Sequence, residues 1–410
     1  MDFGTILVIS LIYVLIGRWL VNTPFRGRYV AFAFLNVLVI YILWFADARS
    51  WFAIYFLFIA LQYTFLSVWS GKTGWQWWFA FLLPIAILAT VRYTPFEMLA
   101  HVSAALAQKL KEFPNYHKDI DTRFVGLSYV AFRSSYLLIE IRNGVVKKPN
   151  LWEYLGFVFF APTLAVGPIN SYNRYQLAFS ADHRPIIPIG TSVVRVLVGA
   201  VKFRFLGPIL NQLTYTGLLR DGNSHPWVDF PIAVIAYYLF LYCNFSGFCD
   251  IAIGGAGIVG ISVAENFDSP FAARNVKVFW NRWHITLSSY MRDVVFAPLS
   301  KVLTRAFGPS NANHAVAATI VVVFLLIGVW HGVGWNYAAF GAAHALGLTV
   351  NHYYTIRLKK WLGRDGFNAY NGNRWIRAAA VGMTFCYCAA ALFLFANTFP
   401  QMRQIFAAMK

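Results

Sequence analysis

The residue best suited to chemistry is His331, in the segment GVWHGVGWN at residues 328–336. Neutral imidazole, with an ordinary pKa of about 6.5, can accept a proton at physiological pH and act as a general base. The stretch 315–354 has no charged side chain over 40 positions. As one straight helix it would be about 60 Å long, roughly twice the hydrocarbon thickness of a bilayer. We therefore expect a break at His331-Gly332-Val333-Gly334, which a membrane tolerates only where protein covers it or a watery cavity adjoins it.

Two further polar residues lie upstream, in segments of different character. Asp250 falls in YCNFSGFCDIAIGGAGIVG (242–260), which is apolar enough to insert and has five glycines that permit close helix packing. His284 falls in NVKVFWNRWHITLSSYMRDVVFAPL (275–299), whose charges and aromatics suit an interfacial or re-entrant segment. On residues alone a structural role stays open for each. Asp250 can pair with an arginine or with backbone amides, His284 can be a satisfied hydrogen-bonding residue, and His331 can be structural.

Composition shows what surrounds these residues. The chain of 410 residues is 59% hydrophobic and 12% charged, whereas a soluble domain has about 25% charged residues. Apolar runs reach the roughly 17–25 residues that cross a bilayer. We expect an all-α polytopic membrane protein with about 11 transmembrane helices. The candidate spans are 3–20, 29–46, 51–69, 77–93, 124–142, 152–168, 189–206, 230–260, 315–330, 335–355 and 376–398.

The segments between these spans are short, and none has the character of a separate soluble domain. Residues 101–123 are amphipathic at first and then polar, which is typical of a segment at the membrane interface. Residues 176–188 and 216–227 are punctuated by Pro and Gly and are expected to be loops. The whole chain, 1–410, is expected to form one helical membrane domain.

The net charge of +18 comes from basic residues dispersed in short loops, a pattern that does not indicate nucleic-acid binding. Arg18, Arg26 and Arg28 lie between the first two spans, whereas Asp47 and Arg49 cancel between the next two. The positive-inside rule therefore predicts a cytoplasmic first loop and an extracytoplasmic N-terminus in a cell membrane. The remaining positive charge suits anionic lipid headgroups or the phosphates of a cytosolic donor.

The four cysteines lie in apolar stretches without the paired spacing of a zinc site, so we expect core residues and no metal. They are Cys243, Cys249, Cys386 and Cys388.

Five segments of the chain resemble motifs of the membrane-bound O-acyltransferase family and occur in the same order as in that family. The resemblance covers a core of about 160–350. The Asn-Arg-Trp-His motif is most similar to that of members that transfer D-alanyl groups, and members that acetylate alginate are similar in the same motifs. The segments are AVGPINSYNRY (165–175), FSGFCDIAIG (245–254), ENFDSPF (265–271), FWNRWHITLSSYMRD (279–293) and GVWHGVGWNYAAFGAAH (328–344).

The resemblance implies a helical bundle with shorter re-entrant or interfacial helices around a central tunnel. It implies His331 as the catalytic histidine and His284 as the second characteristic polar residue of the site, positioned on the donor side. Asn170 stands where the family frequently has an acidic residue, which leaves the acceptor open. Further residues expected to line the tunnel or position substrate are Trp330, Asn281, Trp283, Ser288, Asp250, Asn336 and His344.

The expected chemistry is direct acyl transfer from a thioester, with no tightly bound cofactor. The donor, a phosphopantetheine carrier protein or acyl-CoA, enters from the cytosol, and a hydroxyl of an envelope polymer enters from outside. No Gly-x-Ser-x-Gly segment supports a covalent serine intermediate. Membrane lipids and an extracytoplasmic accessory transferase are the other expected partners. The alternatives are a transporter or flippase, although no similarly interrupted segments pair up in the two halves, and a catalytically silent assembly protein. The acyl group can be acetyl, D-alanyl or longer.

Overall fold

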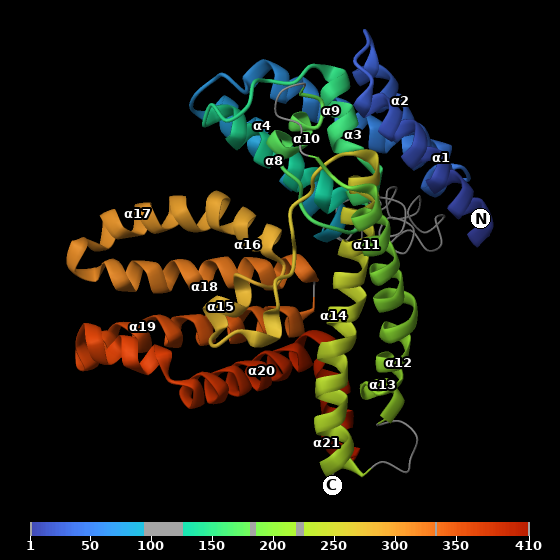
Figure 1. Cartoon of the computed structure of the whole chain (residues 1–410). Coiled ribbons are helices and arrows are strands. Elements are labelled where there is room, and N and C mark those ends of the chain that lie inside the picture. The colour runs from blue at the N-terminus through green and yellow to red at the C-terminus, as the bar shows by residue number, and fades with distance from the viewer. Residues whose placement is uncertain (1, 94–125, 181–185, 219–224, 333, 409–410) are drawn as a thin grey trace, which may run out of the picture. The chain divides into compact units, whose positions relative to one another are not determined.

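In the computed structural model, the described part of the chain consists of helices joined by loops, and its only β-pairing is one isolated bridge between Phe267 and Trp283 (Figure 1). The all-α prediction is therefore confirmed. The chain forms two compact units, Met1–Val198 with Cys249–Ala264, and Gly199–Phe248 with Glu265–Lys410. The single domain over 1–410 stays a prediction. The described residues are 2–93, 126–180, 186–218, 225–332 and 334–408.

The first unit begins with helix α1, which polar contacts join to α2 and to the end of α14 inside the same unit. The Tyr13 hydroxyl donates to the Asn36 side chain at 2.9 Å, and the Arg18 guanidinium donates to the Ile258 carbonyl at 2.9 Å. The helices are α1 (Phe3–Asn22), α2 (Arg28–Ile40, continued by a π-turn Tyr41–Phe45), α3 (Arg49–Trp69), α4 (Trp75–Tyr93), α8 (Leu127–Arg142), α9 (Leu151–Val158), α10 (Tyr172–Leu177) and α11 (Ile189–Val201).

The predicted continuous span over 152–168 is wrong, because α9 ends at Val158 and a short 3-10 turn, Ala161–Thr163, follows. Arg133 of α8 explains where the helix stops. Its buried guanidinium donates to the carbonyls of Phe157 and Val158 and to Thr163. The last carbonyls of a helix have no partner within it, and here a side chain from another helix supplies one.

The second unit holds the segments with the predicted site residues. Within it α19 packs against both α18 and α20, so that the three run side by side (Figure 1). Its helices are α12 (Gly207–Gln212, after a π-turn Lys202–Leu206), α13 (Tyr215–Leu218), α14 (Pro226–Val259, shared with the first unit), α15 (Val276–Trp280), α16 (Ile285–Met291, continued by a π-turn Arg292–Phe296), α17 (Ala297–Phe307), α18 (Ala312–His331), α19 (Trp335–Gly372), α20 (Arg374–Ala396) and α21 (Phe399–Ala408). Short 3-10 turns lie at Pro270–Ala272 and Pro309–Asn311.

Six helices among the described residues are long and apolar enough to cross a membrane. The chain is therefore a multi-pass membrane protein, while the total of about 11 spans and the central tunnel stay predictions. Helix α19 carries the predicted span 335–355 but is not one of the six. The six are Gly4–Asn22, Arg28–Phe45, Arg49–Trp69, Trp227–Val259, Pro309–His331 and Arg374–Ala396.

Three predicted connections fall wholly or partly outside the described residues. The interfacial segment 101–123 lies entirely outside them. Of the loop 176–188, the described part runs from the end of α10 to a non-helical stretch just before α11. Of the loop 216–227, the flanks belong to α13 and α14.

Candidate active site

The uncharged stretch 315–354 does not form one helix, and it is interrupted where the sequence predicted. Helix α18 ends at His331 and α19 begins at Trp335, and Val333 lies outside the described residues. Gly332 caps α18, and a Cβ at this position would collide with the ring of Tyr337. With the Tyr337 ring in this position, Gly332 has no room for a side chain. The end of α18 at His331 and the start of α19 at Trp335 confirm the predicted helix break.

Aromatic rings enclose the His331 imidazole. The ring centroid of His331 lies 4.6 Å from that of Trp330, 5.0 Å from Phe395 and 5.9 Å from Phe340. The buried Asn336 side chain donates to the Phe395 carbonyl at 3.4 Å, so it fixes one wall of this enclosure. His331 itself is only half-buried. The enclosure orients the imidazole and leaves part of it open to a reactant.

His284 has an unusual backbone conformation at the start of α16. Its φ of 46° and ψ of 52° lie in the left-handed region, which few residues other than Gly and Asn adopt. Such a conformation costs about 1–3 kcal/mol and persists only where the surroundings impose it. Here the segment is paired on both sides, because the Asp268 N–H donates to the Arg282 carbonyl at 3.0 Å and the Ile285 N–H to the Asn266 carbonyl at 3.0 Å.

Asn266 is a structural residue of this site to which the sequence motif gave no role. It is fully buried, and its side-chain oxygen accepts hydrogen bonds from the Thr286 N–H at 3.1 Å and the Thr286 hydroxyl at 2.7 Å. These bonds cap the first turn of α16, next to His284. One indication in the sequence that Asn266 belongs to the site is its position in ENFDSPF, one of the five segments that resemble the family.

Burial keeps His284 uncharged. Its side chain is 5% exposed, and its ring lies 4.7 Å from Phe245 and 6.3 Å from Trp330. Burial, and to a smaller extent the charge of His331, lower the pKa of His284 to about 3. No described residue forms a hydrogen bond with its Nδ1. Trp330 thus contacts both histidines, and the deeper of the two is neutral.

The other predicted residues divide between this neighbourhood and the first unit. His344 is buried and accepts a hydrogen bond from the Trp280 indole at 3.2 Å. Its ring centroid lies 4.7 Å from that of Phe340, which also contacts His331. Trp283 is buried among neighbouring aromatics. Asp250 belongs to the first unit, where its carboxylate pairs with Arg195 at 3.0 Å. This is the structural role that the sequence left open for Asp250.

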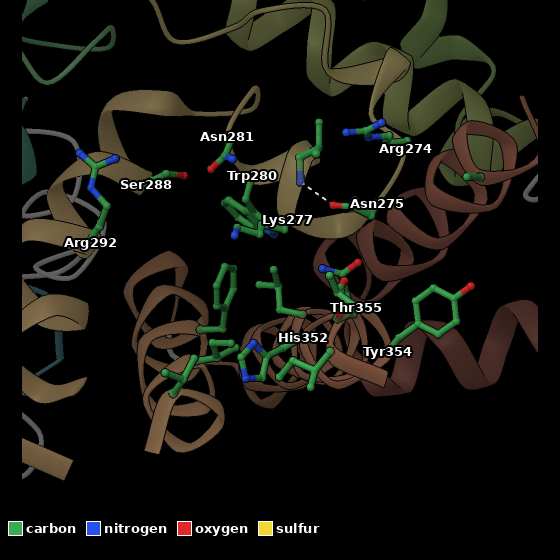
Figure 2. A pocket seen from close by; sticks show the side chains of 18 of the residues that line it. Arg274, Asn275, Lys277, Trp280, Asn281, Ser288, Arg292, His352, Tyr354 and Thr355 are labelled. Atoms are coloured by element: carbon green, nitrogen blue, oxygen red, sulfur yellow. Dashed lines mark hydrogen bonds between the residues drawn. The ribbon is translucent and has the colours of Figure 1, made fainter. Parts of the chain in front are cut away.

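A cavity of about 910 Å³ lies within the second unit, walled by segments of α15, α16, α18, α19 and α20 (Figure 2). The predicted residues Asn281 and Ser288 line it, together with Trp280. Five of its lining residues are Lys or Arg, and none is Asp or Glu. In the described part of the chain, no group of three or more His, Cys, Asp or Glu side chains could hold a metal ion. The cavity suits an anionic, partly apolar organic ligand.

Fold and site together define a class: a multi-pass helical membrane protein with a half-buried histidine at a helix break and a neutral, buried histidine beside it. Such a site can accept a proton inside the membrane domain. The chain belongs to the membrane-bound O-acyltransferase (MBOAT) family, whose model matches residues 73–392. The resemblance seen in the sequence is therefore confirmed.

The chain is similar to proteins that acylate envelope polymers. It is 34% identical over 277 residues to the teichoic acid D-alanyltransferase of Streptococcus thermophilus, across 64% of this chain and 65% of that protein. It is 29% identical over 280 residues to that of Bacillus subtilis, across 67% and 69%. It is 25% identical over 334 residues to the probable alginate O-acetylase AlgI of Pseudomonas syringae, across 76% and 60%. The chain thus spans slightly less than two thirds of the first relative.

Proposed function

We propose that the chain is an O-acyltransferase with His331 as its general base. The enzyme moves a D-alanyl or acetyl group from a cytosolic thioester to a hydroxyl of an extracytoplasmic envelope polymer. The observation that carries this proposal is the His331 imidazole, half-buried at the end of α18 and oriented by Trp330, Phe340 and Phe395. Family membership and the names of the similar proteins, which cite D-alanyl transfer and O-acetylation, support it.

The proposed reaction is a direct transfer. The His331 imidazole takes the proton of the acceptor hydroxyl while the oxygen attacks the thioester carbonyl. The C–O ester bond forms, the C–S bond breaks, and the leaving thiolate recovers the proton from the imidazolium. Holding both reactants in one enclosure replaces a bimolecular encounter, and the aromatic walls limit competing hydrolysis by water.

His284 has a different proposed role, as a positioning residue on the donor side. A neutral imidazole held beside Trp330 can donate or accept one hydrogen bond without adding a charge near His331. The proposed partners are the donor, membrane lipids and an extracytoplasmic accessory transferase, and the proposed location is the cell membrane with the N-terminus outside.

The test is turnover of purified, reconstituted His331→Ala with D-alanyl and acetyl thioesters. Loss of a general base typically lowers the rate 10²–10⁴-fold, so we expect a folded protein with that loss. His314→Ala is the matched control, because His314 is exposed near the other end of α18, about 25 Å away along the helix. Wild-type-like turnover by His331→Ala would contradict the assignment. Substrate movement without consumption of a thioester would favour a transporter.

A further inference from the structure

The connection between α19 and α20 has exposed cations and exposed tryptophans that the acyl-transfer proposal does not use. Residues 357–377 contain six Lys or Arg and one acidic residue, Asp365. Four of these cations are exposed and do not line the cavity of the second unit. Trp361 and Trp375 are 82% and 71% exposed. We name this surface the basic turn, and its residues are Arg357, Lys360, Trp361, Arg364, Arg374 and Trp375.

The basic turn is one-sided on α19. Arg357, Lys360 and Trp361 share one face of the helix, because residues three and four positions apart lie above one another. On another side of the same helix, Leu358 is buried and Leu362 is half-buried. The cations and the indole therefore form an outer face over an apolar inner one.

Arg374 and Trp375 place the basic turn at the level of the lipid headgroups. The apolar span Arg374–Ala396 begins here, and the Asn373 side chain caps its helix by accepting a hydrogen bond from the Trp375 N–H at 2.9 Å. The Arg374 guanidinium lies 5.2 Å from the centre of the Trp375 ring. Tryptophan at the end of a membrane span lies among headgroups, because its ring is apolar and its N–H is polar. A cation at this level meets lipid phosphates.

The charge of the basic turn is not neutralised within the described part of the chain, where none of its four cations forms an ion pair. Two classes of partner are anionic, namely lipid headgroups and acidic soluble proteins. The exposed indoles favour lipid, because both rings are available to the headgroup region and Trp375 belongs to the first turn of a membrane span. A soluble protein would have to displace headgroups to reach the Trp375 ring.

We propose that the basic turn binds the headgroups of anionic phospholipids. Its four cations contact lipid phosphates, and its two indoles lie between the headgroups. Lys and Arg near an anionic membrane surface are attracted to it by an electrostatic force that salt screens. This surface gives the membrane lipids, among the proposed partners, a defined place on the chain, independently of the role of His331.

The test is lipid binding to the detergent-solubilised full-length protein, measured by native mass spectrometry with phosphatidylglycerol and phosphatidylcholine of identical acyl chains. We expect tighter binding of phosphatidylglycerol, because the choline group of the other lipid cancels its phosphate charge. A triple variant with Arg357→Gln, Lys360→Gln and Arg364→Gln should lose most of this preference, since each basic residue near an anionic surface contributes about fivefold. The matched control is a triple variant of exposed cations from other turns, with Arg26→Gln, Lys72→Gln and Lys147→Gln.

Both triple variants should unfold at the wild-type midpoint in detergent, because all six side chains are exposed. An equal loss of lipid preference in the two variants would overturn the proposal, and so would equal binding of the two lipids to the wild type. Binding of an acidic carrier protein in phosphatidylcholine nanodiscs is the second measurement. If the basic-turn variant lost that binding and kept its lipid preference, the surface would belong to a protein instead. His331→Ala should keep the lipid preference while losing turnover, so each proposal can fail without the other.

Discussion

At the scale of single residues, two histidines next to the same tryptophan have different environments. His331 ends a helix and is half-buried, whereas His284 is 5% exposed and starts a helix in a left-handed conformation. Both rings contact Trp330. Neutrality of His284 removes a positive charge that would disfavour proton uptake by His331. The environment, rather than the residue type, therefore separates the proposed base from the proposed positioning group.

The first prediction concerns the pH dependence of kcat/KM. Because the pKa of His284 is about 3, its imidazole stays neutral over the assay range of about pH 5 to 8. Activity should fall as the pH drops through the pKa of the base, and that inflection should belong to His331. We expect His284→Gln to lower kcat/KM while leaving the acidic inflection where it is in the wild type. If the acidic inflection of kcat/KM moved in His284→Gln, the titration would be assigned to His284 instead.

The sequence could identify these histidines but not most of the groups that hold them. The helix break at His331 was predictable because the uncharged stretch 315–354 is too long for one membrane-spanning helix, which is a local property of the sequence. The catalytic role of His331 stays a prediction. The role of Asn266 depends on Thr286, 20 positions away, and that of His344 on Trp280, 64 positions away. Such pairs depend on how separate segments pack, and single-residue patterns do not contain that information.

At the scale of elements, the contact between α18 and α19 depends on two glycines. A Cβ at Gly328 would collide with the Tyr337 carbonyl, and one at Gly341 with the Phe324 carbonyl. The helices flanking the break therefore pack with their backbones close together, as small residues allow in membrane proteins. This contact holds the start of α19, with Asn336 and Phe340, against the end of α18 that carries His331.

The second prediction tests this contact with Gly328→Ala. The added methyl group meets a backbone carbonyl that cannot rotate away, and overpacking of this kind typically costs about 1–3 kcal/mol. We expect a lower thermal unfolding midpoint in detergent and reduced turnover. Gly382→Ala in α20 is the control, because a Cβ there meets nothing within 4 Å. That variant should be neutral or slightly stabilised, since Ala favours helix by about 1 kcal/mol over Gly. Equal midpoints would contradict the packing argument.

Helix ends show where prediction from local sequence fails. The break after His331 was predicted correctly because an uncharged stretch longer than the membrane is visible in the sequence. The end of α9 at Val158 was missed because the residues that follow are still apolar. The hydrogen bonds that satisfy its last carbonyls come from Arg133 on α8. Prolines at 162 and 168 were the local signal that a continuous helix was unfavourable.

At the scale of the whole molecule, the distribution of charge has to agree with the direction of the proposed transfer. A cytosolic phosphate-bearing donor needs its cavity to open on the side where basic residues are retained. The cavity lining holds five Lys or Arg residues and no acid, and the turn from α19 to α20 adds Arg374 beside Trp375. An interfacial Trp with a cation is typical of a segment at the membrane surface. A cavity with this lining is consequently expected on the cytoplasmic side.

The third prediction tests this sidedness with single cysteines in a background lacking the four native ones. Ser289 lines the cavity and is half-buried, and Ser50 is exposed at the start of α3, on the predicted extracytoplasmic side. We expect Ser289→Cys to react with a membrane-impermeant maleimide only in inside-out vesicles, and Ser50→Cys only in right-side-out cells. The pair controls for vesicle leakage, because leaky membranes would label both in both preparations. If Ser289→Cys were labelled in sealed right-side-out cells, the cavity would face the acceptor, and entry of the two substrates from opposite sides would be ruled out.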